Sequence, residues 1–215
     1  MLGTHDLALF ALTVLVVNAT PGVDMVFTLV STLRGGVRAG LAAAAGVGAG
    51  CVVHTLAAAF GLAALMAASA AAFNAVKWVG AAYLLWLAWG MLRAGWRGVA
   101  PRAPEAGAAP QQASGAGPLF RQGFVTNVLN PKVALFFLAL LPQFIDADAP
   151  GKTAAFLFLG AWFIVQGYAF LAAFVLVVAP LRRWQPRAAV TRGLNLAGGG
   201  LFALLAARLA LSERA

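Results

Sequence analysis

Long apolar runs, separated by short basic or Pro/Gly-rich segments, dominate this chain. An α-helix needs about 20 mostly apolar residues to cross the hydrocarbon core of a bilayer. The uncharged stretch from Ala39 to Val76 is too long for one crossing and predicts two helices with a tight turn near Met66–Ala72. We expect six spans, at about 7–30, 39–63, 71–92, 122–142, 152–182 and 193–211. Five spans are the alternative, because Arg208 shortens the last run.

The composition supports a location in a membrane. Of the 215 residues, 62% are apolar and 10% are charged, against about 45–50% and about 25% in ordinary soluble domains. This balance excludes a disordered chain and a water-soluble enzyme with an ordinary surface. Segment 94–118 differs from the rest: it is rich in Pro, Gly, Ala and Gln and has no apolar period. It is predicted to be a flexible linker.

The charges orient the predicted helices. Fifteen Lys and Arg against six Asp and Glu give a formal charge of +9. The basic residues stand in short groups between the apolar runs, where they orient helices and meet anionic lipid, so we expect no nucleic acid partner. With six spans, ten basic residues fall on the side of the linker and four on the other. This bias predicts a cytoplasmic linker and two periplasmic termini. No Lys or Arg precedes the first run, which is therefore expected to stay as a span and not to be a cleaved signal.

The linker divides the chain into two halves of three spans each. Because three is odd, the second half enters the membrane in the opposite sense to the first, which is the arrangement of an inverted repeat. The first span of each half carries a similar motif, Asn18-Ala-Thr-Pro21-Gly22-Val-Asp24 and Asn127-Val-Leu-Asn130-Pro131-Lys132. The predicted fold is an all-α membrane protein with six transmembrane helices as two inverted three-helix repeats and Pro-broken helices 1 and 4. We expect one transmembrane domain over 1–215, with a first repeat at about 7–92, a linker at about 94–118 and a second repeat at about 119–211.

A proline inside a helix frees backbone carbonyls, which in a membrane need partners in the protein or in a water-filled cavity. Two broken helices that meet near mid-depth are a common way to build a transporter's substrate site. The alternative is that Pro21 and Pro131 only kink their helices for packing.

Asp24 and Lys132 are the acid and the base that lie well inside predicted spans. An ionisable side chain at the bilayer centre costs about 2.5–3.5 kcal/mol on insertion scales, so it usually faces a cavity or a partner. We therefore expect Asp24 and Lys132 to pair or to share one polar cavity. The candidate substrate-binding residues are Asn18, Pro21, Gly22, Asp24, Asn127, Asn130, Pro131 and Lys132.

Other polar residues in the spans have two interpretations. Asp24 and His54 are the candidates for proton coupling, although a lone His on a helix of small residues is usually a packing residue. Gln166, Tyr168 and Asn195 either hydrogen-bond across helices or serve function. The pairs Gly46/Gly50 and Gly36/Gly40 have the spacing that lets helices approach closely.

We find no catalytic motif: there is no GxSxG, HExxH, Walker loop or Gly-rich dinucleotide turn. No enzyme activity, cofactor, catalytic residue or metal-binding residue is expected. Cys51 is the single cysteine, which excludes the paired cysteines of a membrane redox carrier. A cation or metal-ion exporter and a passive small-solute channel remain as alternatives to a transporter of organic substrates. Metal export would favour several carboxylates, histidines or thiolates in the spans.

A set of motifs, in this order along about 7–180, resembles the LysE/RhtB family of bacterial amino-acid exporters. The motifs are Thr20-Pro21-Gly22-Val23-Asp24, Arg34-Gly35-Gly36-Val37-Arg38-Ala39-Gly40, Gly46-Val-Gly48-Ala-Gly50, Gly80-Ala-Ala-Tyr83-Leu84, Gly123-Phe-Val-Thr-Asn127-Val-Leu-Asn130-Pro131-Lys132 and Leu141-Pro142-Gln143-Phe144. The family usually opens with Pro-Gly-Pro and an acid or amide. Here Val23 replaces the second Pro, whereas Asp24 keeps the acid.

The resemblance implies a multi-pass protein of the bacterial inner membrane that exports amino acids, is driven by the proton motive force and alternates access around a midplane site. Its expected partners are the amino acid, protons and membrane lipid, and the resemblance also allows a homodimer. With one acid in the cavity, a neutral substrate such as threonine, homoserine or a branched-chain amino acid is expected over a dibasic one. Lys132, Asn127 and Asn130 are then the candidates for the substrate's carboxylate, and Asp24 with the carbonyls near Asn18 for its ammonium.

Overall fold

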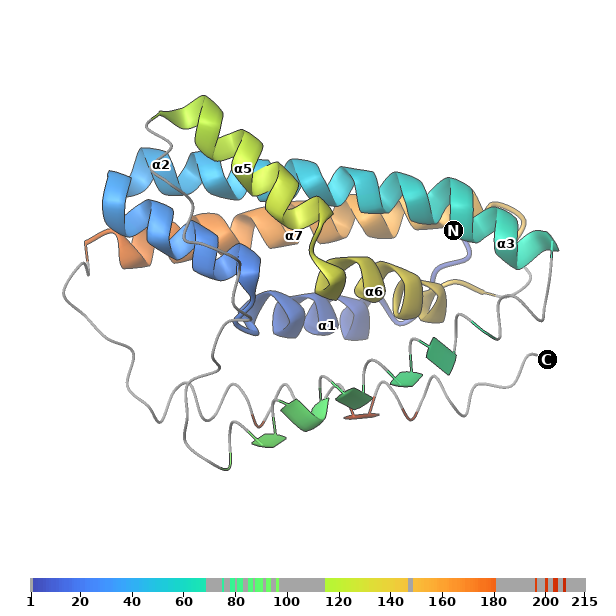
Figure 1. The fold of residues 1–215 in the computed structure, drawn as a ribbon. Coiled ribbons are helices and arrows are strands. Elements are labelled where there is room, and N and C mark those ends of the chain that lie inside the picture. The colour runs from blue at the N-terminus through green and yellow to red at the C-terminus, as the bar shows by residue number, and fades with distance from the viewer. Residues whose placement is uncertain are drawn as a thin grey trace.

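The computed structural model describes residues 2–68, 115–146 and 149–180, with isolated residues between 75 and 96 and between 196 and 207. In these parts the chain is built from helices (Figure 1). They are α1 (Leu7–Ala19), α2 (Val23–Leu56), the π-helix η1 (Ala57–Leu62), α3 (Ala63–Ala68), α5 (Ala116–Val128), α6 (Pro131–Ala139), the 3₁₀-helix η2 (Leu141–Phe144) and α7 (Lys152–Val178). The spans predicted at 71–92 and 193–211, most of the linker, the turn after Ala68 and Asn195 lie outside the continuous described segments.

Two helical segments, Val23–Leu65 and Lys152–Val178, are each long and apolar enough to cross a membrane. A third candidate is the bent pair Ala116–Val128 and Pro131–Phe144, whose two parts meet at 51°. The helix expected from Lys152 onward is confirmed. So is the break at Asn130-Pro131, where the proline leaves α6 without a donor at its first position.

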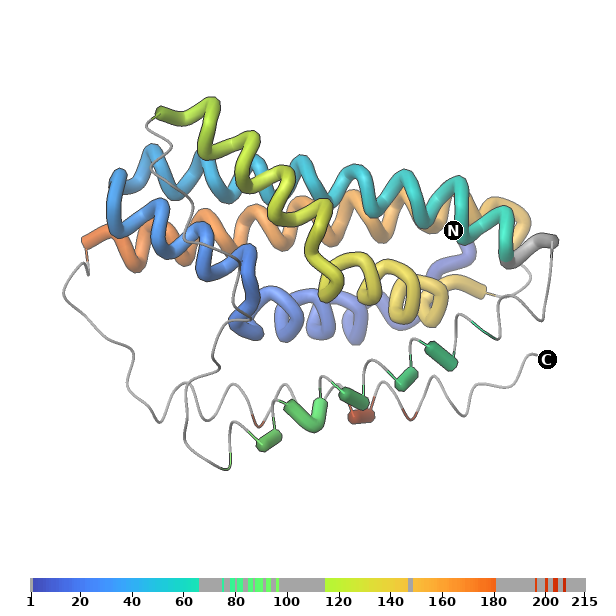
Figure 2. The backbone as a smooth tube through the Cα atoms, viewed as in Figure 1, coloured from blue at the N-terminus to red at the C-terminus, as the bar shows by residue number. Residues whose placement is uncertain are grey.

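The chain reverses inside α2. Gly36 has φ 71° and ψ −164°, a combination outside the helical region that glycine adopts without a steric penalty. A side chain at Gly40 would collide with Thr32, although eight residues of straight helix would separate them by about 12 Å. Figure 2 shows the tube turning back along α2 at this point. Gly36, which was expected to pack two helices together, instead forms the turn between them.

The first predicted span is therefore broken, as the sequence indicated. It consists of α1 and the part of α2 before Gly36, separated by Thr20, Pro21 and Gly22. Thr20 is the C-cap of α1 and is extended, and Gly22 is the N-cap of α2. The returning part of α2 continues through η1 and α3 and covers the second span, which was expected at 39–63.

α1 and the α6–η2 segment lie antiparallel. Phe10 near the start of α1 stacks edge-on against Phe144 at the end of η2, with ring centroids 5.1 Å apart. At the other end, the Lys132 ammonium at the start of α6 reaches the last turn of α1. Two segments that are distant in the sequence are thus in contact at both of their ends.

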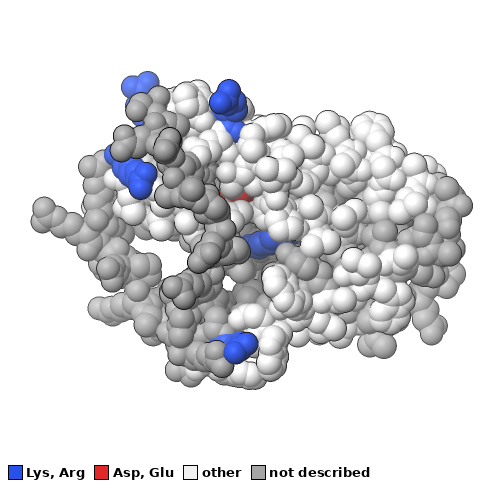
Figure 3. Space-filling view, in the orientation of Figure 1, with Lys and Arg blue, Asp and Glu red and all other residues white. Residues whose placement is uncertain are grey.

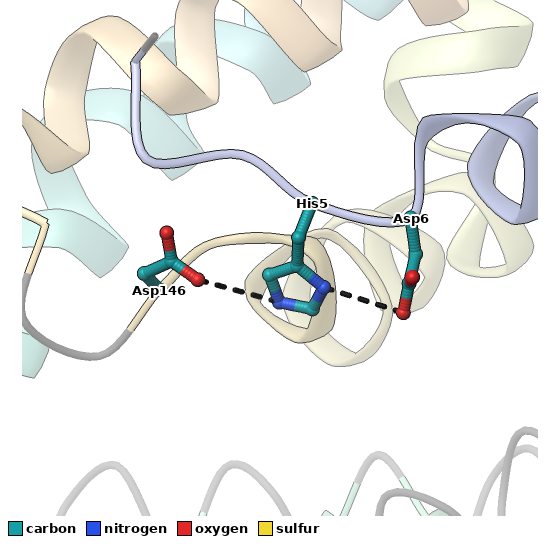
Figure 4. Close-up of polar contacts among 3 residues, drawn as sticks. All are labelled: His5, Asp6 and Asp146. Carbon is teal, nitrogen blue, oxygen red and sulfur yellow. Dashed lines mark ion pairs between the residues drawn. The ribbon is translucent and has the colours of Figure 1, made fainter.

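The N-terminal segment pairs with the chain that follows η2. His5 N donates to the Phe144 carbonyl at 3.1 Å, and Asp146 N donates to the Gly3 carbonyl at 2.8 Å. The His5 imidazole lies between two carboxylates, 3.3 Å from Asp6 and 4.0 Å from Asp146 (Figure 4). These contacts tie the start of the chain to the end of η2.

Close glycine contacts join α2 to α5. A side chain at Gly46 would run into the backbone of Phe120, and one at Gly50 would come within 2.7 Å of Asn127. From the other side, Gly123 of α5 abuts the Ala43 carbonyl. The prediction that Gly46 and Gly50 let helices approach closely is confirmed. Polar contact across helices is also found, because Gln166 of α7 donates to the Ala11 carbonyl at 2.8 Å.

We predict that Gly46→Ala strongly destabilises the fold, because the new methyl group meets backbone of α5 that cannot move aside. Overpacking of this kind costs typically about 1–3 kcal/mol. The measurement is the thermal unfolding midpoint of the purified protein in detergent. Gly61→Ala is the matched control, since a Cβ at Gly61 has no heavy atom of another described segment within 4 Å. Equal midpoints for the two variants would contradict the prediction.

Candidate functional site

A cavity lies where the two helix breaks meet beside α7. Its polar lining is formed by Asn18, Thr20, Asp24, Asn127, Asn130 and Lys132. Its empty volume is about 540 Å³, a figure that includes the space open to solvent at its mouth. The breaks predicted from Pro21 and Pro131 thus meet at a single site.

Asp24 stands in the first turn of α2, directly after the first break. Its Oδ2 atom accepts hydrogen bonds from Asn127 and Asn130, each at 2.9 Å. Its position is also favourable, because the N-terminal end of a helix attracts negative charge. The carboxylate is therefore held in place by the other half of the chain.

Asn127 and Asn130 are buried, and their amide groups are oriented by Asp24. A carboxylate only accepts hydrogen bonds, so each Asn presents its NH₂ group to it. The Asn130 side-chain oxygen then accepts from Lys132 N at 3.0 Å and caps α6. Asn127 lies at the end of α5, with 0% of its surface exposed. Both residues were expected to bind a substrate carboxylate, but here their NH₂ groups serve Asp24.

Lys132 reaches from α6 into the first break. Its ammonium donates to the Val17 carbonyl at 2.8 Å and to the Thr20 carbonyl at 2.9 Å. Negative partial charge collects on the carbonyls at a helix C-terminus, so a cation is favourable there. We expected these loosened carbonyls near Asn18 to meet a substrate's ammonium, whereas in the structure Lys132 occupies them.

Asp24 and Lys132 line one cavity, as predicted, without a direct ion pair among the described contacts. Gly22 lies between them in the lining, and a Cβ built on it would be 3.5 Å from the Lys132 ammonium nitrogen. The ammonium thus stands beside the start of α2. That start has no side-chain cap, in contrast to α6.

Two buried acceptor atoms in the cavity lining remain without a partner. They are Asp24 Oδ1 and Asn127 Oδ1, for which the described residues provide no hydrogen-bond donor. A buried acceptor without a donor costs about 1–3 kcal/mol, and more when it is charged. These two acceptors could therefore be satisfied by a ligand or water that donates hydrogen bonds.

The rest of the lining is mostly apolar. α7 contributes Phe163, Ile164, Gly167, Tyr168 and Leu171, and the other side includes Val17, Met25, Val47, Gly48, Cys51 and Val133. Sequence reasoning did not assign the α7 residues to a site, because an apolar helix carries no polar signal. Tyr168 was the exception, as one of the polar residues considered for function.

The side chains of Asn18 and His54 contact backbone carbonyls near the cavity. Asn18 donates to the Val14 carbonyl at 2.9 Å and lies against Gly167 of α7. His54 is buried, and its Nε2 lies 3.1 Å from the Asn127 carbonyl. Its ring packs 5.8 Å from that of Phe137. His54 is absent from the cavity lining and touches the site through the backbone of Asn127.

Comparison with known proteins identifies relatives over nearly the full length. The model of the LysE type translocator family matches residues 15–213. A homoserine/homoserine lactone efflux protein of Salmonella typhimurium is 31% identical over 210 residues, which cover 96% of each chain. An uncharacterized membrane protein of Pseudomonas aeruginosa is 33% identical over 97% of this chain and 96% of its own. A leucine efflux protein of an Enterobacter species is 32% identical over 88% of each chain. No solved structure matches the chain with significance.

We predict that Lys132→Met lowers stability more than Lys132→Met combined with Asp24→Asn does. The single change leaves the buried carboxylate without its nearby cation, and an uncompensated buried charge is destabilising. In the double variant a neutral amide replaces the carboxylate, so part of the lost stability is recovered. Thermal unfolding in detergent measures both variants, in a double-mutant cycle with Asp24→Asn.

Lys152→Met is the matched control for this cycle. Its ammonium contacts the Ala149 carbonyl at 3.4 Å, at the start of α7 and outside the cavity. We expect this change to have little effect. If the effects of Asp24→Asn and Lys132→Met simply add, the two side chains do not stabilise each other.

Proposed function

The chain belongs to the LysE type translocator family, whose members are transporters and not enzymes, and we propose that it exports neutral amino acids in exchange for protons. The observation that carries this proposal is the buried acid beside a buried base in one cavity, with two buried acceptor oxygens of lining residues that lack a donor among the described residues. The relatives named as homoserine and leucine efflux proteins point to the same class of substrate.

The proposed architecture has six transmembrane helices in two inverted repeats, at about 7–92 and 119–211, joined by a cytoplasmic linker at about 94–118. The reciprocal contact of the breaks supports it. Asp24 of the first repeat is bound by Asn127 and Asn130 of the second, and Lys132 of the second binds carbonyls of the first. Such an exchange of contacts is what two repeats related by a pseudo-two-fold axis in the membrane would produce.

The substrate's ammonium group is proposed to bind at Asp24. Its N–H groups would supply the donors that the buried acceptors Asp24 Oδ1 and Asn127 Oδ1 lack among the described residues, and the opposite charge offsets the cost of burying both groups. The backbone carbonyls at the first break are already bound by Lys132. In this arrangement Asn127 acts on the ammonium and not on the carboxylate.

The substrate's carboxylate is proposed to bind between Lys132 and the start of α2. Two hydrogen bonds of the ammonium are used by carbonyls, and a lysine has three donors. Beside it, the uncapped N-terminus of α2 at Gly22 offers backbone N–H groups and a favourable dipole. Asn18, Pro21, Asn130 and Pro131 then shape the site by holding the two breaks.

A neutral side chain fits the rest of the lining. The acid and the base are matched by the charges of the amino acid itself, so the site has no further charge for a second ammonium. The remaining wall is mostly apolar and includes Val47, Phe163 and Leu171. We therefore favour homoserine, threonine and branched-chain amino acids over dibasic ones.

Coupling to protons is proposed to occur at Asp24. A bare carboxylate in this cavity is unfavourable, so Asp24 holds either the substrate's ammonium or a proton. Release of the amino acid to the outside then favours uptake of a proton there, and the proton leaves on the cytoplasmic side when the next substrate binds. His54, which contacts the backbone of Asn127, is the second candidate for this role.

We also propose that the protein lies in the bacterial inner membrane and that its basic residues set its orientation there. Arg34 and Arg38 flank the turn at Gly36, and Arg121 lies near the start of α5. In Figure 3 the Lys and Arg side chains gather over this end, and the described residues in view at the other end show none. The basic end is proposed to face the cytoplasm, with both chain termini in the periplasm.

We predict that Asp24→Asn abolishes export. Loss of the carboxylate removes the charge partner of the ammonium, which corresponds to a decrease of about 100-fold or more in kcat/KM. The assay is uptake of radiolabelled homoserine and leucine into inside-out membrane vesicles. Asp146→Asn is the matched control, because Asp146 lies beside His5 and outside the cavity (Figure 4). Equal uptake by the two variants would refute the role of Asp24.

We also predict that uptake by the wild-type protein depends on the pH gradient. Respiring inside-out vesicles have an acidic lumen, so protons leave as the amino acid enters, and accumulation exceeds the external concentration. Nigericin dissipates this gradient, and we expect accumulation to fall to the equilibrium level. Accumulation that persists after nigericin would show that another gradient drives transport.

A further inference from the structure

Gly48 is a glycine of α2 whose lack of a side chain is not required by a close contact between described helices. Gly46 and Gly50 are one turn apart and face α5, where a side chain would meet Phe120 or Asn127. Gly48 is two residues from each and therefore projects from the opposite side of the helix. Among the described residues, a Cβ built there approaches only Tyr168 Cδ2, at 4.0 Å, which is an ordinary contact distance.

A methyl group at position 48 would favour the helix. Alanine is better than glycine in a helix interior by about 1 kcal/mol, and alanine already occupies positions 42–45 and 49. Gly48 lines the cavity, as does Tyr168 of α7. The missing methyl group thus leaves space in the cavity, whereas the missing methyl groups at Gly46 and Gly50 let two helices touch.

We propose that Gly48 sets the largest substrate side chain that the cavity admits. This inference rests on the proposed function and concerns the same site. The groups that bind the amino acid's charges come from the start of α2, α5 and α6. Gly48 belongs instead to the wall formed by the returning part of α2 and by α7, with Val47, Tyr168 and Leu171. Once the charged groups are bound, the substrate's side chain has this wall to occupy.

The expected effect of Gly48→Ala is a change in selectivity and not a general loss of export. A methyl group at this wall competes for space with a long or branched side chain, and much less with a short one. In apolar pockets one methylene group changes discrimination by about 10–200-fold. We expect the ratio of kcat/KM for leucine to that for homoserine to fall by about tenfold or more, with homoserine export retained.

The experiment compares wild type, Gly48→Ala and Gly61→Ala in inside-out vesicles with radiolabelled leucine and homoserine. Immunoblots of the membranes normalise the rates to the amount of protein. Gly61→Ala adds the same methyl group in η1, outside the cavity lining and more than 4 Å from the heavy atoms of the other described segments. A fall in the leucine-to-homoserine ratio for Gly48→Ala alone supports the proposal. Equal ratios in the two variants, or failure of Gly48→Ala to accumulate in the membrane, overturn it.

A second variant tests whether the methyl group acts inside the cavity. Gly48→Ala combined with Tyr168→Ala removes the side chain nearest to the new methyl group. We expect this double variant to regain leucine export relative to Gly48→Ala, and no recovery would overturn the proposal.

The wild-type measurement separates the proposed function from the proposed size limit. If wild type exports neither amino acid, the proposed function fails and the size limit fails with it; if wild type exports both and the Gly48→Ala ratio is unchanged, only the size limit fails.

Discussion

The structure depends on the satisfaction of backbone groups that two proline breaks set free. In a membrane these groups have no water to bind, so each break needs partners from elsewhere in the protein. At the first break Lys132 binds the Val17 and Thr20 carbonyls, and at the second His54 Nε2 lies 3.1 Å from the Asn127 carbonyl. The contacts are also reciprocal, because Asp24, which follows the first break, is bound by the Asn127 and Asn130 side chains at the second. The cavity between the breaks is polar because the side chains that make these reciprocal contacts line it. The same side chains hold the two segments together and supply its chemistry.

Within that cavity, the hydrogen bonds are unevenly distributed over Asp24. Oδ2 accepts two of them, whereas Oδ1 has no donor among the described residues. A purely structural acid would be expected to have both oxygens satisfied. The close contact of α2 with α5 at Gly46 and Gly50 brings the acid to the asparagines, and α7 closes the cavity with an apolar wall. The hydrogen-bonded oxygen therefore positions the carboxylate, and Oδ1 is the atom to which the proposed ligand would donate.

Much of this arrangement could be predicted from the sequence, but the pairing of its groups could not. Pro21 and Pro131 predict helix breaks because proline lacks an N–H group, and Asp24 and Lys132 predict a shared cavity because charges avoid lipid. Both predictions are confirmed. The sequence shows which groups need a partner and not which partner lies within reach. For that reason the sequence did not show that the NH₂ groups of Asn127 and Asn130 bind Asp24, or that Lys132 occupies the carbonyls. Gly36 was misread for a related reason, since small size suits both a helix contact and a positive φ.

Reciprocal contacts also constrain how the proposed transporter could move. If the segments at the two breaks move against each other, the bonds from Lys132 to α1 and from the asparagines to Asp24 lie across the moving boundary. These bonds are few and polar, so water or a zwitterion can replace them at modest cost. The glycine contact between α2 and α5 has no such substitute, because backbone there meets backbone and a gap would lose packing without gaining hydrogen bonds. An amino acid that bridges the acid and the base would thus bind where the two breaks exchange partners, which is the position from which binding can shift the balance between two conformations.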